Sequence, residues 1–419
     1  MDIREVLFKL SSLDSVGAVH DAADYAAEEL KKYAEVERRG AAVIGKIKGA
    51  ADYTVLLDAH IDQVAFTVTD IDGEGFITAA CCGGIDLRAL PARAVTVHGK
   101  KNIPAVFCST PPHLASGETE YSDIASIKLD TMLGAKAKDL VSLGDYITFS
   151  AEPAELSGGL VTGRSFDDRA GVACLLKTAE LLSGKALPCR VVLLFSDAEE
   201  LGMRGAAAAS FGIRPDEVIA VDVTFGDGIG ISAEECGKLG GGPMIGFSPV
   251  LDSGVSKKLC KVAAENGIDY APEVMGGRTG TNADVLSTAE SGAKTCTVSI
   301  PLRNMHTEVE TVSLADIESS IINKIKNHCE YKIDPLGSII AFKKGKKTPA
   351  KKVMLDAHMD EVGLIITYIT DDGFLKFSAV GGIDTSVLMF RRVKVNGING
   401  VISGKPIHLI SADERKKLP

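Results

Sequence analysis

The sequence lacks the features that mark several large classes of protein. No run of roughly 18 apolar residues without a charge occurs, so we expect no helix that spans a bilayer. The nine cysteines are few for 419 residues and form no CxxC pair, which argues against a disulfide framework and favours a cytoplasmic location. Lys and Arg number 46 against 56 Asp and Glu, a net charge of −10, so nucleic acid and anionic membrane are poor partners.

Recognisable targeting and nucleotide-binding motifs are also missing. The N-terminus carries acids from Asp2 onward and apolar residues at helical spacing, which is not the pattern of a signal peptide. The glycine-rich segments 239–243 and 276–280 match neither a P-loop nor a dinucleotide-binding GxGxxG. The composition, 45% apolar and 24% charged, is that of a globular chain, and at about 150 residues per domain its length predicts two to three domains.

The chain contains an internal repeat. The segment VLLDAHIDQVAFTVTDIDGEGFITAACCGGID (55–86) returns as VMLDAHMDEVGLIITYITDDGFLKFSAVGGID (353–384). The numbers of His60 and His358 differ by 298, as do those of Asp86 and Asp384, so the two copies align without a gap. A looser match of PPHL to PIHL follows at an offset of 295. We therefore expect a partial second copy at 331–419.

The rest of the chain predicts an α/β fold. Amphipathic helical patterns alternate with short apolar runs, which is typical of a catalytic α/β sandwich around a mostly parallel sheet. Between them, many short β-branched runs predict an inserted barrel-like β domain. We expect the catalytic domain at 1–67 and 156–330, the β domain at 68–155 and the truncated repeat at 331–419.

Acids and histidines follow several of the predicted strands. The carboxyl ends of parallel strands share one edge of a sheet, so side chains there can converge although they are far apart in sequence. The acidic pair Asp167 and Asp168 lies where a helix is expected to begin, and the backbone N–H groups at the start of a helix favour carboxylates. The side chains concerned are His60, Asp62, Asp167, Asp168, Glu199, Glu200, Asp222 and His306.

A mixture of imidazoles and carboxylates without thiolates suits a hydrolytic site for zinc, cobalt or manganese. One carboxylate can bridge two cations, which together activate a water molecule. In the adjacent pair Glu199 and Glu200, one carboxylate could bind metal while the other moves a proton. Asp62, two residues after His60, could orient the imidazole.

These motifs resemble those of the dinuclear-metal aminopeptidases of metallopeptidase family forty-two, which include glutamyl, deblocking and tetrahedral aminopeptidases. The resemblance covers about residues 1–325 and rests on DAHID, SFDDRAG, AEELGMRGA, AVDV, TGTNAD and SIPLRNMHTEVE in the family's order. It departs at Gln63, where the family usually has an acid, and at Asn282, where many members have an aspartate.

The resemblance implies a role for each candidate residue. His60 and Asp222 would bind one metal ion, Glu200 and His306 the other, and Asp167 both, with zinc or cobalt as the two ions. The catalytic residues would be Glu199, as general base, and Asp62, behind the first histidine. The reaction would be removal of N-terminal residues from short peptides. The inserted β domain would build homo-oligomers, from dimers up to a twelve-subunit tetrahedral shell.

Other hypotheses remain open from the sequence. A related enzyme could hydrolyse small acylated amines with the same metals, and an inactive scaffold could keep the fold. The second copy has His358 and Asp360 but no counterparts of the later ligands, so it cannot form a site alone. It could be a truncated duplication, an artefact of expression or gene prediction, or an accessory module that docks on the first copy.

Overall fold

The structure is a computed structural model that describes residues 1–109, 123–232, 234–265, 267–290, 292–318, 363–380 and 387–404. The chain divides into two compact units, one of residues 1–320 with 384–419 and one of residues 321–383. Among the described helices, none is long and apolar enough to cross a membrane.

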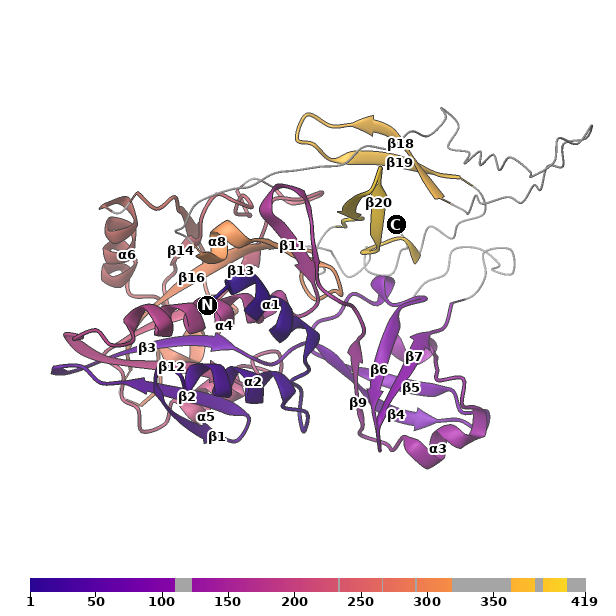
Figure 1. The fold of residues 1–419 in the computed structure, drawn as a ribbon, viewed down its shortest axis with the longest axis horizontal. Helices are drawn as coiled ribbons and strands as arrows, with labels where there is room; N and C mark the ends of the chain where they lie inside the picture. The colour runs from indigo at the N-terminus through magenta and orange to yellow at the C-terminus, as the bar shows by residue number, and fades with distance from the viewer. Residues whose placement is uncertain are drawn as a thin grey trace, which may run out of the picture. The chain divides into compact units, whose positions relative to one another are not determined.

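An 11-stranded mixed sheet forms the centre of the larger unit (Figure 1). Its order is β1-β2-β12-β3-β13-β16-β17-β11-β10, and β14 and β15 join it beside β16. The strands are β1 (Glu35–Arg39), β2 (Ala42–Ile47), β3 (Ala51–His60), β10 (Ala154–Glu155), β11 (Leu160–Gly163), β12 (Cys189–Ser196), β13 (Glu217–Phe225), β14 (Met244–Phe247), β15 (Ala271–Val274), β16 (Lys294–Arg303) and β17 (Glu310–Ser313).

Four central strands, β12, β3, β13 and β16, are parallel to one another. The outer strands β1, β2, β17, β11 and β10 pair antiparallel. The expected α/β fold is therefore confirmed, with a parallel centre and antiparallel margins. The carboxyl ends of the four central strands lie at the same edge.

Helices cover both faces of this sheet because its buried strands are apolar on both sides. Along β12, Leu193 and Phe195 pack in the core that contains α1, α2 and α4, whereas Val192 and Leu194 pack with α5 and α7 on the other side. The helices are α1 (Ile3–Ser12), α2 (Asp21–Leu30), α3 (Ala137–Leu140), α4 (Phe166–Leu182), α5 (Arg204–Ala209), α6 (Ser253–Glu265), α7 (Ala283–Leu286) and α8 (Leu314–Glu318), with short 3-10 turns η1 (Leu87–Ala89), η3 (Ile124–Ser126), η4 (Gly134–Lys136) and η5 (Ser157–Gly159).

A closed barrel of order β4-β5-β8-β7-β6-β9 forms the inserted β domain. Phe66 is fully buried inside it and meets Phe107 and Phe149 edge to face, with ring centroids 5.0 and 5.5 Å away. Its first strand begins at Ala65, three residues before the expected boundary at 68. The strands are β4 (Ala65–Ile71), β5 (Ile77–Cys82), β6 (Ala94–His98), β7 (Asn102–Phe107), β8 (Leu129–Asp130) and β9 (Tyr146–Phe149).

The described part of the second copy consists of two hairpins. β18 (Gly363–Ile369) pairs with β19 (Leu375–Val380) in the smaller unit. β20 (Arg392–Val395) pairs with β21 (Ile398–Val401) in the larger unit. Residues 331–362, which include His358 and Asp360, and residues 405–419 lie outside the described part of the chain.

Candidate metal centre

The predicted side chains gather at the carboxyl edge of the central strands. His60 ends β3, Asp222 lies on β13 and Asp167 is in the first turn of α4. Glu199 and Glu200 follow β12, and His306 follows β16. These six side chains line one cavity of about 650 Å³. Asp62, 3% exposed, lies behind His60 and is not among the lining residues.

Asp167 lies between the two histidines. Its Oδ1 is 2.9 Å from His60 Nε2 and its Oδ2 is 3.2 Å from His306 Nε2. His306 Nε2 is also 3.3 Å from Glu200 Oε1, and His60 Nε2 is 3.9 Å from Asp222 Oδ1. One carboxylate thus faces two imidazoles, each of which has a second carboxylate beside it. This is an arrangement that can hold two neighbouring cations with Asp167 between them.

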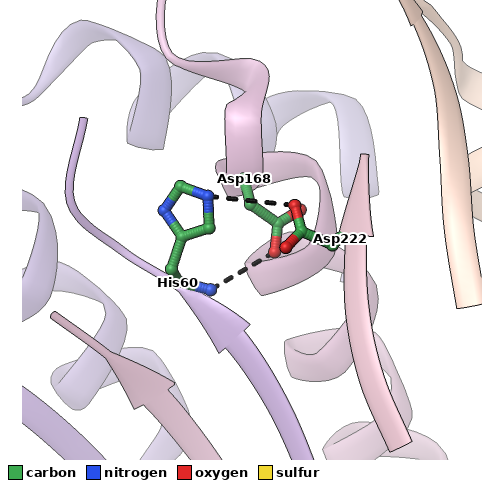
Figure 2. Close-up of side chains that lie close together, drawn as sticks. All are labelled: His60, Asp168 and Asp222. Atoms are coloured by element: carbon green, nitrogen blue, oxygen red, sulfur yellow. Dashed lines mark hydrogen bonds and ion pairs between the residues drawn. The ribbon is translucent and has the colours of Figure 1, made fainter. Parts of the chain in front are cut away.

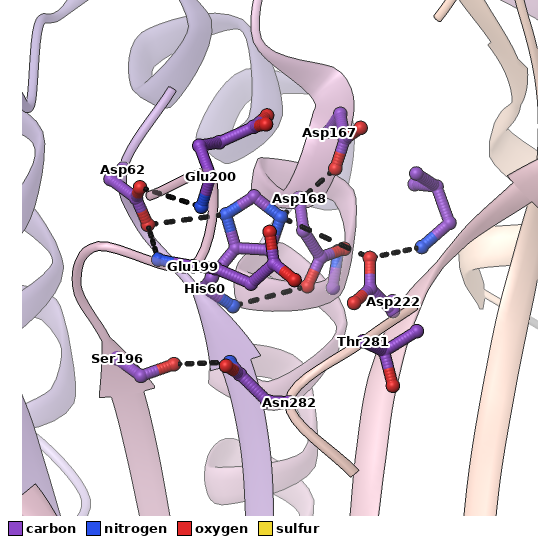
Figure 3. A network of polar contacts seen from close by, with 12 residues as sticks. His60, Asp62, Asp167, Asp168, Ser196, Glu199, Glu200, Asp222, Thr281 and Asn282 are labelled. Atoms are coloured by element: carbon purple, nitrogen blue, oxygen red, sulfur yellow. Dashed lines mark hydrogen bonds and ion pairs between the residues drawn. The ribbon is translucent and has the colours of Figure 1, made fainter. Parts of the chain in front are cut away.

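Asp62 connects the first histidine to the acidic pair (Figure 3). Its Oδ1 accepts a hydrogen bond from the backbone N–H of Glu199 (3.1 Å) and is 3.4 Å from His60 Nδ1. Its Oδ2 accepts one from the backbone N–H of Glu200 (3.3 Å). A single buried carboxylate therefore holds the loop that carries both glutamates and lies beside the imidazole of His60.

Asp168 also lies close to His60 and Asp222, as Figure 2 shows. The sequence assigned it no ligand role, yet these three residues offer donor atoms near enough to share an ion. However, Asp168 Oδ2 accepts from the backbone N–H of His60 (3.3 Å) and Oδ1 from that of Gly171 (3.0 Å). Asp167 lines the cavity and Asp168 does not. Asp167 therefore faces the cavity, and Asp168 holds the backbone beside it.

Gly171 makes that backbone contact possible. A Cβ at this position would lie 2.5 Å from both carboxylate oxygens of Asp168. Any larger residue would therefore push Asp168 away from the start of α4. The glycine of the SFDDRAG motif thus has a steric reason to follow the acidic pair.

Glu310, at the start of β17, is a component that sequence reasoning missed. It is 1% exposed, and its carboxylate accepts from the backbone N–H of His306 (2.7 Å) and of Asp167 (3.1 Å). Burial and repulsion from Asp167 raise the pKa of Glu310 to about 8. Glu310 is part of the motif HTEVE in the sequence. A single acidic residue beside a strand does not, however, predict a contact with the distant backbone of Asp167.

The site carries more carboxylates than cationic groups. Burial raises the pKa of Glu199 to about 8 and that of Asp222 well above its usual value. Burial also acts to raise the pKa of Asp167, but hydrogen bonds from His306 and His60 outweigh it and lower this pKa. Burial opposes charge on His60, yet its contacts with Asp167 and Asp62 raise its pKa. Clustered buried carboxylates of this kind are stabilised by divalent cations, so the donor set fits metal ions.

Several residues beside the site have left-handed backbone without being glycine. Ser165 (φ 59°) precedes Asp167 by two residues, Ala198 (φ 55°) precedes Glu199, and His306 itself has φ 63°. This conformation is unfavourable for ordinary residues, and in folded proteins it concentrates at functional sites. The turns that present the site are therefore held by their surroundings rather than by local preference.

The two departures noted in the sequence lie outside the cavity lining. Gln63 accepts from the backbone N–H of Ser15 (3.3 Å) and from Arg169, and donates to Asp14 (3.3 Å). Asn282 donates to Asp58 Oδ2 and Ser196 Oγ, both at 2.8 Å. Both amides therefore support the strands and turns beneath the site, and neither lines the cavity.

The fold and the site define an α/β protein with a candidate metal centre, and comparison with known proteins identifies its family. The model of the M42 glutamyl aminopeptidase family matches residues 41–322 and again 337–419, so the chain belongs to this family and carries a second, partial match to it.

Individual relatives agree with that assignment. The chain is 29% identical over 288 residues to a lysyl aminopeptidase of Pyrococcus furiosus. This alignment covers 67% of this chain and 82% of the relative. It is similar to the solved structure of an aminopeptidase from Desulfurococcus kamchatkensis (TM-score 0.70, 29% identity, 76% and 91% of the two chains). It is also similar to the TET1 peptidase of Pyrococcus horikoshii (TM-score 0.68, 28% identity, 76% and 96%), described as assembling into a tetrahedron or a large octahedral shell.

Proposed function

We propose that this protein is a metal-dependent aminopeptidase that removes N-terminal residues from short peptides. The observation that carries the proposal is Asp167, which faces His60 and His306 with opposite oxygens at the wall of an open cavity. Family membership supports the same activity. Hydrolysis of small acylated amines and a role as an inactive scaffold are not favoured.

The proposed ligands follow the geometry of the site. His60 and Asp222 would hold one cation, Glu200 and His306 would hold the second, and Asp167 would contribute to both. Zinc and cobalt are the proposed metals because imidazole and carboxylate ligands suit both. Divalent cations in such a site polarise the scissile carbonyl and acidify the attacking water.

The chain's own residues complete the chemistry. The carboxylate of Glu199 accepts the proton of the attacking water and then delivers it to the nitrogen of the leaving peptide, as general bases in hydrolases do. Asp62 holds the backbone N–H of Glu199, so the base keeps its position relative to His60. The cavity accommodates the N-terminal side chain.

We further propose that this cavity favours basic over acidic N-terminal residues. Glu273 is on its wall, where its two oxygens accept from Thr224 Oγ1 (2.5 Å) and Ser299 Oγ (2.6 Å). Glu234 and Glu235 also line the cavity, and none of the described lining residues is a lysine or arginine. Like charges brought together in a desolvated site repel, so an acidic substrate side chain is disfavoured.

Assembly and location are part of the proposal. Solved relatives described as a dodecamer and as a tetrahedral or octahedral shell support a homo-oligomer, from a dimer up to twelve subunits, with the barrel as the dimerisation domain. The cysteine pattern of the sequence favours the cytoplasm, and the eight cysteines of the described residues are free thiols.

The test measures metal content and hydrolysis of a panel of aminoacyl and acylated amides after loading with zinc or cobalt. We expect Glu199→Gln to retain two metal ions per chain and to lose about 10²–10⁴-fold in kcat. Glu234→Gln removes the same charge elsewhere on the cavity wall and should leave kcat on a leucine substrate within about twofold. Cleavage of acylated amides only, or no turnover with two metals bound, would contradict the proposal.

The same panel tests the preference for basic residues. Glu273→Gln should reduce the ratio of lysyl to leucyl turnover, measured as kcat/KM, by about tenfold, equivalent to about 1.4 kcal/mol. Equal rates on lysyl and glutamyl substrates in the native protein would refute the preference without affecting the aminopeptidase proposal.

A further inference from the structure

Two arginines separated by the repeat offset make the same local contact. Arg93 Nε donates to the carbonyl of Ala89 at 2.7 Å, and Arg391 Nε donates to that of Val387 at 3.0 Å. The numbers of both the donors and the acceptors differ by 298, so the two contacts occupy equivalent positions in the two copies of the repeat.

The backbone around the two arginines is also equivalent. Ala92 and Phe390 both have left-handed φ, 59° and 57°. Their N–H groups donate to Phe107 and Ile402, each at 2.9 Å. The hairpin β6–β7 follows the first turn and β20–β21 the second. We call residues 89–93 the first arginine turn and residues 387–391 the second arginine turn.

Each arginine also reaches across to the other turn. Arg93 Nη2 donates to the carbonyl of Met389. Arg391 Nη2 donates to the carbonyl of Pro91 (3.3 Å) and to that of Ala92. Met389 and Pro91 are again equivalent positions of the repeat. The contact is therefore reciprocal: each copy presents the same donor to the same acceptor of the other, which is the defining feature of a twofold, isologous interface.

The two sides of this interface differ in their apolar residues. The second turn has Met389 and Phe390, 6% and 2% exposed, which cluster with Ala89 and Val309. The first turn has Pro91 and Ala92 at the equivalent positions. A larger apolar side chain buries more surface, and attachment to the same chain raises the local concentration of the second turn. Both effects favour the internal contact over contact with a separate chain.

We propose that the first arginine turn is a self-complementary docking surface for a second copy of this chain, and that the appended repeat occupies it from within. In the native chain the first arginine turn pairs with the second arginine turn. If the second turn were released, the first arginine turn of one chain would make the same contacts with the first arginine turn of another chain. The full chain is therefore closed to twofold pairing through this surface. Any assembly of the native protein, including one through the barrel, then uses faces other than the first arginine turn.

The test compares full-length variants by light scattering and by hydrogen exchange of residues 387–404. Phe390→Asp, and separately Arg391→Ala, should release the second turn and double the particle mass in a concentration-dependent way. Adding Arg93→Ala to either variant should restore the native mass, because it removes the donor of the paired surface. The control is Arg392→Ala, since this arginine donates to the Glu152 carbonyl outside the reciprocal contact and should leave the mass unchanged.

Three results would overturn the proposal. A released second turn with no change in mass would show that the surface does not pair. A second turn that stays protected in both variants would show that the reciprocal contact does not hold it. A native particle that loses half its mass in Phe390→Asp would show that the turn docks on a neighbouring chain instead.

Discussion

The hairpins β4–β5 and β18–β19 come from the two copies of the repeat and share one register. Ala65 pairs with Cys82 and Gly363 with Val380, and each hairpin has a register shift at the same place, after Val68 and after Ile366. Their surroundings differ. Ile77 is fully buried in the closed barrel, whereas its counterpart Leu375 is 37% exposed.

This difference shows that the local sequence of a hairpin determines its strand pairing, whereas the burial of its side chains depends on the rest of the fold. The strand pairing and the register shift are the same in both copies and follow from the local sequence. Burial follows only where other strands close the barrel, and β8 and β9 have no counterpart among the described strands of the second copy. The same contrast applies to the proposed metal centre, whose proposed ligands all lie within residues 60–306. Matched variants in the two copies can test this comparison.

The largest contrast is expected for the two equivalent histidines. His60→Ala removes a proposed ligand and should lower kcat/KM by at least about 10³-fold, or roughly 4 kcal/mol of transition-state stabilisation. His358→Ala should leave activity within about twofold and metal content at two ions per chain. Metal analysis and aminopeptidase assays on the same preparations check both. A loss of activity in His358→Ala would show that the second copy contributes to catalysis.

A smaller contrast is expected in stability. Ile77→Ala leaves a cavity in the barrel and should lower the free energy of unfolding by about 2–4 kcal/mol. Leu375→Ala removes a side chain that is already partly in water and should cost less than about 1 kcal/mol. Urea unfolding followed by circular dichroism measures both, since the chain has no tryptophan to report by fluorescence. Equal losses would mean that the second hairpin is packed in a core of its own.

The smallest contrast concerns the aspartates behind the histidines. Asp62→Asn weakens the support of His60 and should reduce metal affinity by about 10–100-fold. The matched variant Asp360→Asn should leave the affinity unchanged. Competition titration with a chelator measures both affinities. An unchanged metal affinity in Asp62→Asn would mean that Asp62 holds only the loop of Glu199 and Glu200 and does not support His60.

Much of the fold and the gathering of the site could be predicted from the sequence. Alternating helical and apolar segments indicated the α/β fold, and polar residues at the ends of strands share one sheet edge by geometry. Glu310 and Asp168 could not be assigned in this way, because their partners are backbone N–H groups that no side-chain pattern reveals. The reciprocal contact of Arg93 and Arg391 was equally hidden, since a repeat in sequence does not say whether its copies meet.

The carboxylate of Glu310 accepts from the backbone N–H of Asp167, which lies 143 residues earlier in the sequence, and from that of His306. A contact between residues so far apart in sequence requires closure of a long loop, and contacts of this kind slow folding. The turn that holds Asp167 therefore depends on a residue far along the chain and not on its local sequence alone. During synthesis, a growing chain would acquire the full set of proposed ligands only after most of its catalytic domain had already emerged from the ribosome.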